Sequence, residues 1–186
     1  MKFIPSRLYH VYNQGNNQET IFKCSGDYLL FLKKVRKLIL PQCEILAYNL
    51  MPNHFHFMIM ASVKSAIAYQ LSSVETNELS NAFRLLLSEY AQDFNKTNNR
   101  SGSLFRQKTK AKDLSESSQK DAPLFCFNYI HNNASEAGLV KFSKEWEFCS
   151  LKDFLGLRNG TLCNQALAFD LLGIDENYIK EMALHF

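Results

Sequence analysis

The sequence predicts an α+β protein with a ferredoxin-like (RRM-like) antiparallel sheet, helices on one face of that sheet, and a partly helical C-terminal tail. Three observations support this prediction. Some segments place apolar residues at every second position, as strands do, and others place them at the 3.6-residue period of helices. The segments follow the order strand, helix, strand, strand, helix, strand, with one further helix. The 186 residues suffice for one domain with an extension, which we expect at residues 1–145 and 146–186.

The first strand and helix are marked by composition and by turn residues. Residues 8–13 (LYHVYN) are rich in aromatic and β-branched side chains, and the turn-forming residues 15–17 (GNN) follow them. Residues 28–40 place apolar side chains at helical spacing and end before Pro41. The basic side chains of this helix are expected to form a solvated face.

The next three elements are also predicted from their patterns. Two apolar runs, 43–51 and 54–61, are separated only by Pro52-Asn53, which favours a tight antiparallel hairpin. Residues 76–96 carry large apolar side chains at helical steps and end in a polar run.

Two more elements complete the expected core. Residues 103–114 alternate polar and basic side chains, as a solvent-facing strand near the sheet edge does. A polar loop at 115–121 leads into a helix that begins near Pro123 and closes at Gly138. The remaining residues form the small helical tail.

Composition limits the class of protein. The chain is 46% hydrophobic and 21% charged, as soluble globular proteins are. It has no signal-peptide pattern and no run of about 20 apolar residues, so we expect a cytoplasmic protein without membrane contact. The five cysteines include no C-x-x-C pair, which argues against disulfides and against a cysteine zinc site.

Positive charge is concentrated in one segment although the net charge is only +3. The stretch 100–112 contains no acidic residue and interleaves Phe105 with basic side chains. Such a pattern suits phosphate contacts and base stacking on single strands, and it equally suits a solvated edge strand. The candidate DNA-binding residues are Arg100, Arg106, Lys108, Lys110 and Lys112.

Two histidines form the first candidate for chemistry. His54 and His56 lie two apart in an expected strand, so both imidazoles point to one face and are able to share a metal ion. Taken alone, such a pair is more typical of half-buried core histidines. A metal site would need another ligand from elsewhere in the fold, because no Cys, Asp or Glu stands beside the pair.

The helix around residue 129 offers the missing groups. Tyr129 and Asn133 are spaced i to i+4 and share a helix face, and His131 lies between them. Tyrosine is a covalent nucleophile, and a divalent metal that polarises a phosphate oxygen assists attack on a phosphodiester. The alternative is that Tyr129 is a packed aromatic beside Phe125 and Ile130.

Five segments in order resemble the REP-associated tyrosine transposases and related single-tyrosine HUH transposases of bacterial insertion sequences. The resemblance spans roughly residues 8–151. The segments are YHVYNQGNNQETIF, AYNLMPNHFHFMI, YAQDFNKTNNRSGSLFRQKTKAK, YIHNNASEAGLV and WEFCS.

The resemblance implies a catalytic domain of the histidine-hydrophobic-histidine type. His54 and His56 would bind Mg²⁺ or Mn²⁺, Asn133 would be the third ligand, and Tyr129 would attack single-stranded DNA. The implied products are a 5′-phosphotyrosine and a free 3′-OH, with no nucleotide cofactor. The implied partner is a single-stranded DNA hairpin held by residues 100–112. Homodimers are found among such proteins, and for this chain both a homodimer and a monomer stay open.

The chain departs from the family pattern at two places. Relatives often have Asn-Pro-x-Arg-Ala-Gly where residues 133–138 read NASEAG, and Gln14 stands where an arginine is common. An alternative is therefore a domesticated hairpin-DNA-binding protein with little or no cleavage activity. A replication-initiating or relaxase-type nickase and a plain metallohydrolase are weaker alternatives, because the chain lacks room for appended domains and an acidic ligand cluster.

Overall fold

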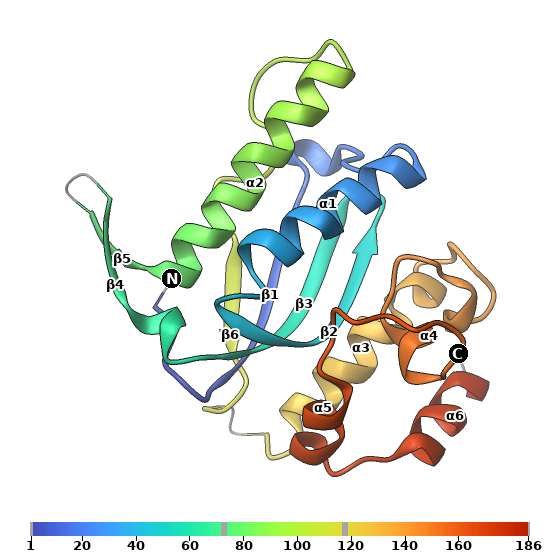
Figure 1. The fold of residues 1–186 in the computed structure, drawn as a ribbon. Coiled ribbons are helices and arrows are strands. Elements are labelled where there is room, and N and C mark those ends of the chain that lie inside the picture. The colour runs from blue at the N-terminus through green and yellow to red at the C-terminus, as the bar shows by residue number, and fades with distance from the viewer. Residues whose placement is uncertain (1, 72–73, 117–118, 186) are drawn as a thin grey trace.

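A computed structural model describes residues 2–71, 74–116 and 119–185 of the chain (Figure 1). The main sheet is built from β1, β2, β3 and β6, and most helices follow in the second half of the chain. The elements in order are β1 (Leu8–Gln14), η1 (Asn16–Gln18), α1 (Ser25–Leu38), β2 (Cys43–Met51), β3 (His54–Ala61), η2 (Lys64–Ala66), β4 (Ala68–Leu71), β5 (Val74–Asn77), α2 (Glu78–Thr97), β6 (Lys110–Asp113), α3 (Ala122–Glu136), η3 (Ser143–Glu145), α4 (Leu151–Phe154), α5 (Gln165–Leu172) and α6 (Glu176–His185).

The main sheet has the strand order β2-β3-β1-β6 with antiparallel neighbours throughout. With α1 and α2 between the strands in sequence, this is the ferredoxin-like arrangement, so the predicted fold class is confirmed. The hairpin of β4 and β5, which the sequence pattern did not predict, projects beside the start of α2 (Figure 1).

The two faces of the sheet carry different kinds of side chain. On one face, Phe55 of β3 packs against Phe31 of α1, with ring centroids 5.3 Å apart, and Phe31 packs against Tyr90 of α2 at 5.1 Å. Because side chains alternate along a strand, His54 and His56 point to the other face. That face is covered by α3, which contacts β2 and β3.

Strand register decides which residues join the histidines. In the β1–β3 ladder, His10 lies opposite Met58, Tyr12 opposite His56 and Gln14 opposite His54. Directly opposite residues of an antiparallel pair share a face, so His10 and Tyr12 lie beside the histidines of β3.

The C-terminal segment covers the outer edge of β2. The backbone N–H of Leu50 donates to Phe148 O at 2.9 Å, and the indole N–H of Trp146 donates to Leu50 O at 3.0 Å. Such a cover protects an edge strand from pairing with other chains. Residues 146–164 therefore pack directly on the sheet. The expected division of the chain at residue 145 remains a prediction.

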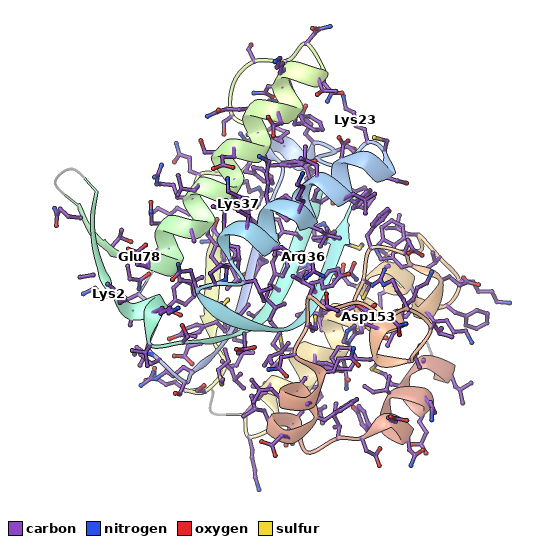
Figure 2. The ribbon with its side chains drawn as sticks, viewed as in Figure 1. Lys2, Lys23, Arg36, Lys37, Glu78 and Asp153 are labelled. Atoms are coloured by element: carbon purple, nitrogen blue, oxygen red, sulfur yellow. The ribbon has the colours of Figure 1, made fainter. Side chains whose placement is uncertain are left out.

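Polar contacts hold this segment in place. The buried Asp153 carboxylate accepts a hydrogen bond from Arg158 at 2.6 Å. Arg36 of α1 donates to the backbone oxygen of Thr161 at 3.3 Å, so one exposed basic side chain of the first helix also contacts the C-terminal segment. Figure 2 shows Arg36 and Lys37 on α1 and Asp153 among the C-terminal helices.

The expected strand at 103–114 is much shorter in the structure. Only Lys110–Asp113 pairs continuously with β1, and Phe105 makes a single bridge to Gly15. Phe105 is 5% exposed and packs against Phe55 and Tyr90, so the expectation that it stacks on a base is wrong. Leu104 beside it is also fully buried, so this part of the expected solvent-facing strand contributes to the core.

Two further expectations concern the rest of the chain. Residues 117–118 of the expected loop at 115–121 lie outside the described residues. Within the described part, no helix is both long and apolar enough to span a membrane.

Candidate active site

His54 is positioned by a tightly held turn. The N–H of Gly15 donates to Asn53 O at 2.8 Å, which ties the end of β1 to the turn before β3. A Cβ at Gly15 would lie 2.2 Å from Glu19 O, so only glycine allows this close approach. The side-chain oxygen of Asn53 lies 2.6 Å from His54 Nδ1, and His54 Nε2 lies 3.3 Å from Asn133 Oδ1. A neutral imidazole carries only one N–H, so when Nδ1 donates to Asn53, Nε2 is left with a free lone pair beside Asn133 Oδ1.

His56 lies deeper and is held by a third histidine. It is 5% exposed, and its Nδ1 shares a hydrogen bond of 2.9 Å with His10 Nε2. His56 Nε2 is buried and makes no hydrogen bond to any residue that the structure describes. A buried polar atom without a partner is costly, so a ligand at this nitrogen would relieve an existing deficit.

The helix α3 is fixed to the sheet by a buried amide. Asn49 of β2 donates from Nδ2 to the backbone oxygen of Ile130 at 2.7 Å. This contact places Tyr129 over the histidines, with its ring centroid 5.3 Å from that of His56 and 6.0 Å from that of His10. Tyr129 is 43% exposed, so it is not a packed core aromatic.

A pocket of about 360 Å³ opens between these groups and β6. It exposes the Tyr129 side chain, two imidazoles and one ammonium group to the same space. Its lining includes His10, Tyr12, His56, Lys112, Phe125, Cys126 and Tyr129.

Burial keeps the three imidazoles of this face neutral. Desolvation, with a smaller contribution from Lys112, lowers the pKa of His10 to about 4. Desolvation also lowers the pKa of His56 well below its ordinary value, with His10 and His54 adding to the effect. The pKa of His54 is lowered by desolvation and partly restored by Asn133. Neutral imidazole is the form that binds metal ions.

The donor set fits a divalent cation. The 3.3 Å between His54 Nε2 and Asn133 Oδ1 is close to the roughly 3 Å that separates neighbouring ligands of an octahedral ion with bonds of about 2.1 Å. Among residues 2–71, 74–116 and 119–185, no group of three or more His, Cys, Asp or Glu is arranged to hold a metal. A metal site here would therefore depend on the amide of Asn133.

The predicted basic residues occupy three environments. Lys110 and Lys112 lie opposite Tyr12 and His10 in the ladder, and Lys112 lines the pocket of Tyr129. Arg106 and Lys108 are exposed and line a separate groove of about 640 Å³ against α2.

Arg100 forms an ion pair and hydrogen bonds within the protein. Its guanidinium pairs with the carboxylate of Glu19 and also donates to Ser103 O at 3.0 Å. The pairing with Arg100 lowers the pKa of the Glu19 carboxyl. Arg100 thus braces the turn after β1, and its predicted contact with DNA remains a prediction.

Sequence reasoning also missed residues around the site. His131, considered beside Asn133, is buried on another side of α3, where its Nε2 lies 2.8 Å from Ser150 Oγ. His10, Asn49 and Asn53 were not identified as site residues. Only Asn53 carries a local signal, because it directly precedes His54.

Comparison with known proteins identifies the fold. No family model matches the chain, and no curated protein matches it. A solved structure of a REP-associated tyrosine transposase bound to a REP hairpin aligns with a TM-score of 0.57. The alignment covers 81% of this chain and 79% of the other at 16% sequence identity. The chain therefore shares the fold of this tyrosine transposase, an antiparallel sheet covered by helices.

Proposed function

We propose that the chain is a metal-dependent transposase that binds single-stranded hairpin DNA and cleaves and rejoins it through a 5′-phosphotyrosine intermediate. One observation carries the proposal. His54 and His56 from β3 and Asn133 and Tyr129 from α3 meet on one face of the sheet, although 79 residues separate His54 from Asn133. The fold shared with a tyrosine transposase supports the same conclusion.

The metal would be held by His54 Nε2, His56 Nε2 and Asn133 Oδ1. His54 Nε2 and Asn133 Oδ1 already face each other, and His56 Nε2 is buried without a partner among the described residues. When bound, Mg²⁺ or Mn²⁺ would polarise a phosphate oxygen as a Lewis acid. Asn53 holds the ring of His54, and His10 holds the ring of His56, as carbonyl and imidazole partners of metal-binding histidines do.

Tyr129 would carry out the covalent step. Its phenol oxygen forms a bond to the phosphorus, the bond from phosphorus to the 3′ oxygen breaks, and the phenol proton ends on that oxygen. The products are a 5′-phosphotyrosine and a free 3′-OH, and the reverse reaction rejoins the strand. Lys112 faces the same pocket and would bind the charged phosphate.

The groove beside α2 would take the hairpin. Arg106 and Lys108 are exposed there, and Arg84 of α2 lines the opposite wall. Paired basic walls suit the closely spaced phosphates of a folded strand. The solved transposase with this fold was itself bound to a REP hairpin, which favours the same ligand class here.

The test is formation of a covalent adduct. Wild-type protein is incubated with labelled single-stranded hairpin DNA and Mg²⁺ or Mn²⁺, and a denaturation-resistant complex is expected. Tyr129→Phe should abolish the adduct. Tyr12→Phe is the matched control, because Tyr12 is a second exposed tyrosine of the same pocket. Removing its hydroxyl should leave the adduct in place if Tyr129 is the nucleophile.

Two results would contradict parts of the proposal. An adduct formed by Tyr129→Phe would show that another group is the nucleophile. Cleavage by His54→Ala at the wild-type rate would remove the metal site from the mechanism.

A second candidate is a hairpin-binding protein that does not cut. The lost arginine within residues 133–138, where the sequence reads NASEAG, and the glutamine at position 14 favour it. Tight hairpin binding without any metal-dependent adduct would support this candidate over the transposase.

A further inference from the structure

A second pocket, of about 500 Å³, lies between α3 and α6. Its walls combine aromatic rings with carboxylate and amide groups from both helices. The groups that matter for recognition are Phe125, Asn128, Tyr129, Glu136, Tyr178 and Glu181.

This pocket adjoins the candidate active site. Phe125 and Tyr129 line both pockets, so they form the ridge between them. They stand one helical turn apart on α3 and are 65% and 43% exposed. A strand whose phosphate lies against Tyr129 would therefore bring a neighbouring nucleotide to the second pocket.

The two pockets have opposite charge. Lys112 lines the active-site pocket, whereas Glu136 and Glu181 line the second one. Two carboxylates repel a phosphate group but accept hydrogen bonds from amino groups. The second pocket therefore favours a group with N–H donors and disfavours the sugar-phosphate backbone.

The amide of Asn128 in the pocket wall is held in place but lacks one hydrogen bond. Asn128 donates from Nδ2 to the hydroxyl of Tyr178 at 2.6 Å, which fixes its amide. Its Oδ1 is buried and has no hydrogen-bond partner among the described residues. The exposed faces of Phe125 and Tyr129 are available for stacking, the sequence-tolerant contact that aromatic rings make with bases.

We propose that this pocket binds a nucleobase that carries an exocyclic amino group, next to the cleaved phosphate. Cytosine, adenine and guanine carry such a group, and thymine does not. The proposal rests on the proposed function, since it takes single-stranded DNA as the substrate. It also gives the C-terminal helix α6 a role in choosing the nucleotide beside the cleavage site.

The experiment measures base discrimination without cleavage. Fluorescence anisotropy with labelled dC12 and dT12, in EDTA, gives the ratio of the two dissociation constants. Wild type should bind dC12 more tightly by about fivefold or more, as one good base contact provides. Glu181→Ala should bring the ratio toward one, while Glu176→Ala, which removes the same charge from the same helix, should leave it unchanged.

Stacking is tested by a second pair of variants. Phe125→Ala should weaken binding of both oligonucleotides by about fivefold or more. Leu157→Ala is the control, because Leu157 is also 65% exposed and lies outside the pocket. Equal effects of the two alanine variants would overturn the stacking contact.

The outcomes separate this proposal from the proposed function. A wild-type protein that forms the covalent adduct but binds dC12 and dT12 equally would overturn the base pocket alone. A protein that discriminates the bases but never forms an adduct would keep the pocket and overturn cleavage. A ratio that falls equally in Glu181→Ala and Glu176→Ala would reduce the effect to general electrostatics and overturn the pocket.

Discussion

The hydrogen bond between His10 and His56 makes a prediction about metal binding. If His56 binds a cation through Nε2, its Nδ1 must carry the proton and donate to His10 Nε2 across the 2.9 Å contact. His10→Leu removes that acceptor and leaves Nδ1 buried without a partner, because His56 is only 5% exposed. The expected cost is about 1–3 kcal/mol in folding stability, and metal affinity should fall by roughly 10–100-fold.

The assay is a titration of Mn²⁺ by isothermal calorimetry, with thermal unfolding of the metal-free protein in parallel. A loss of about 1–3 kcal/mol lowers the unfolding midpoint by roughly 2–12 °C for a chain of this size. His10→Gln keeps an acceptor and should recover most of the Mn²⁺ affinity. The reasoning fails if His10→Leu binds Mn²⁺ as tightly as wild type, or if Gln and Leu weaken binding equally.

Three further predictions follow from individual residues. The double variant Arg106→Ala, Lys108→Ala should weaken hairpin binding and lower the slope of log affinity against log salt by roughly two, whereas Arg100→Ala should chiefly reduce stability in urea, since Arg100 pairs with Glu19. A salt slope that stays at the wild-type value would exclude the groove as a phosphate site. Burial lowers the pKa of His131 to about 3, so the unfolded chain binds the extra proton between about pH 6.5 and 3, and stability falls on acidification by about 1.4 kcal/mol per pH unit from this group. His131→Asn should reduce the slope of unfolding free energy against pH measured in EDTA by about 1.4 kcal/mol per pH unit, with His10, His54 and His56 supplying the rest, and an unchanged slope would contradict the assignment. Native protein should expose one fast-reacting thiol, Cys24, to a colorimetric thiol reagent, because the other four cysteines are buried, and five thiols should react after unfolding. Rapid reaction of a second thiol would show that the native packing around a buried cysteine opens easily.

Local patterns were sufficient to predict the parts of the fold that depend on neighbouring residues. The strands at 43–51 and 54–61 agree with the structure at both ends, because Pro52-Asn53 interrupts two apolar runs. The helix bearing Tyr129 was also expected, since Pro123 marks its first turn and Gly138 follows its end. A period of two placed His54 and His56 on one face for the same local reason.

Features that depend on tertiary packing were not predictable in this way. The contact of His10 with His56 spans 46 residues and depends on the register of β1 against β3, which no local pattern specifies. Phe105 has the same composition signal whether it stacks on a base or enters the core, and only the space beside Phe55 decides. Likewise, the pairing of Arg100 with Glu19 depends on the turn after β1, and the two residues lie 81 positions apart in the sequence.

The proposed ligands also give a role to Lys112, the basic residue that lines the pocket of Tyr129. Two neutral imidazoles and an amide contribute no negative charge, so they would leave the double charge of a bound cation uncompensated. The phosphate of the DNA would supply that charge, which ties metal binding to substrate binding through a shared coupling free energy. On this proposal Lys112 would strengthen the attraction for phosphate at the same pocket, whereas Glu136 and Glu181 would repel the backbone from the adjoining one. Tyr129 lines both pockets. It would therefore reach the phosphate in the first pocket while the neighbouring base is bound in the second.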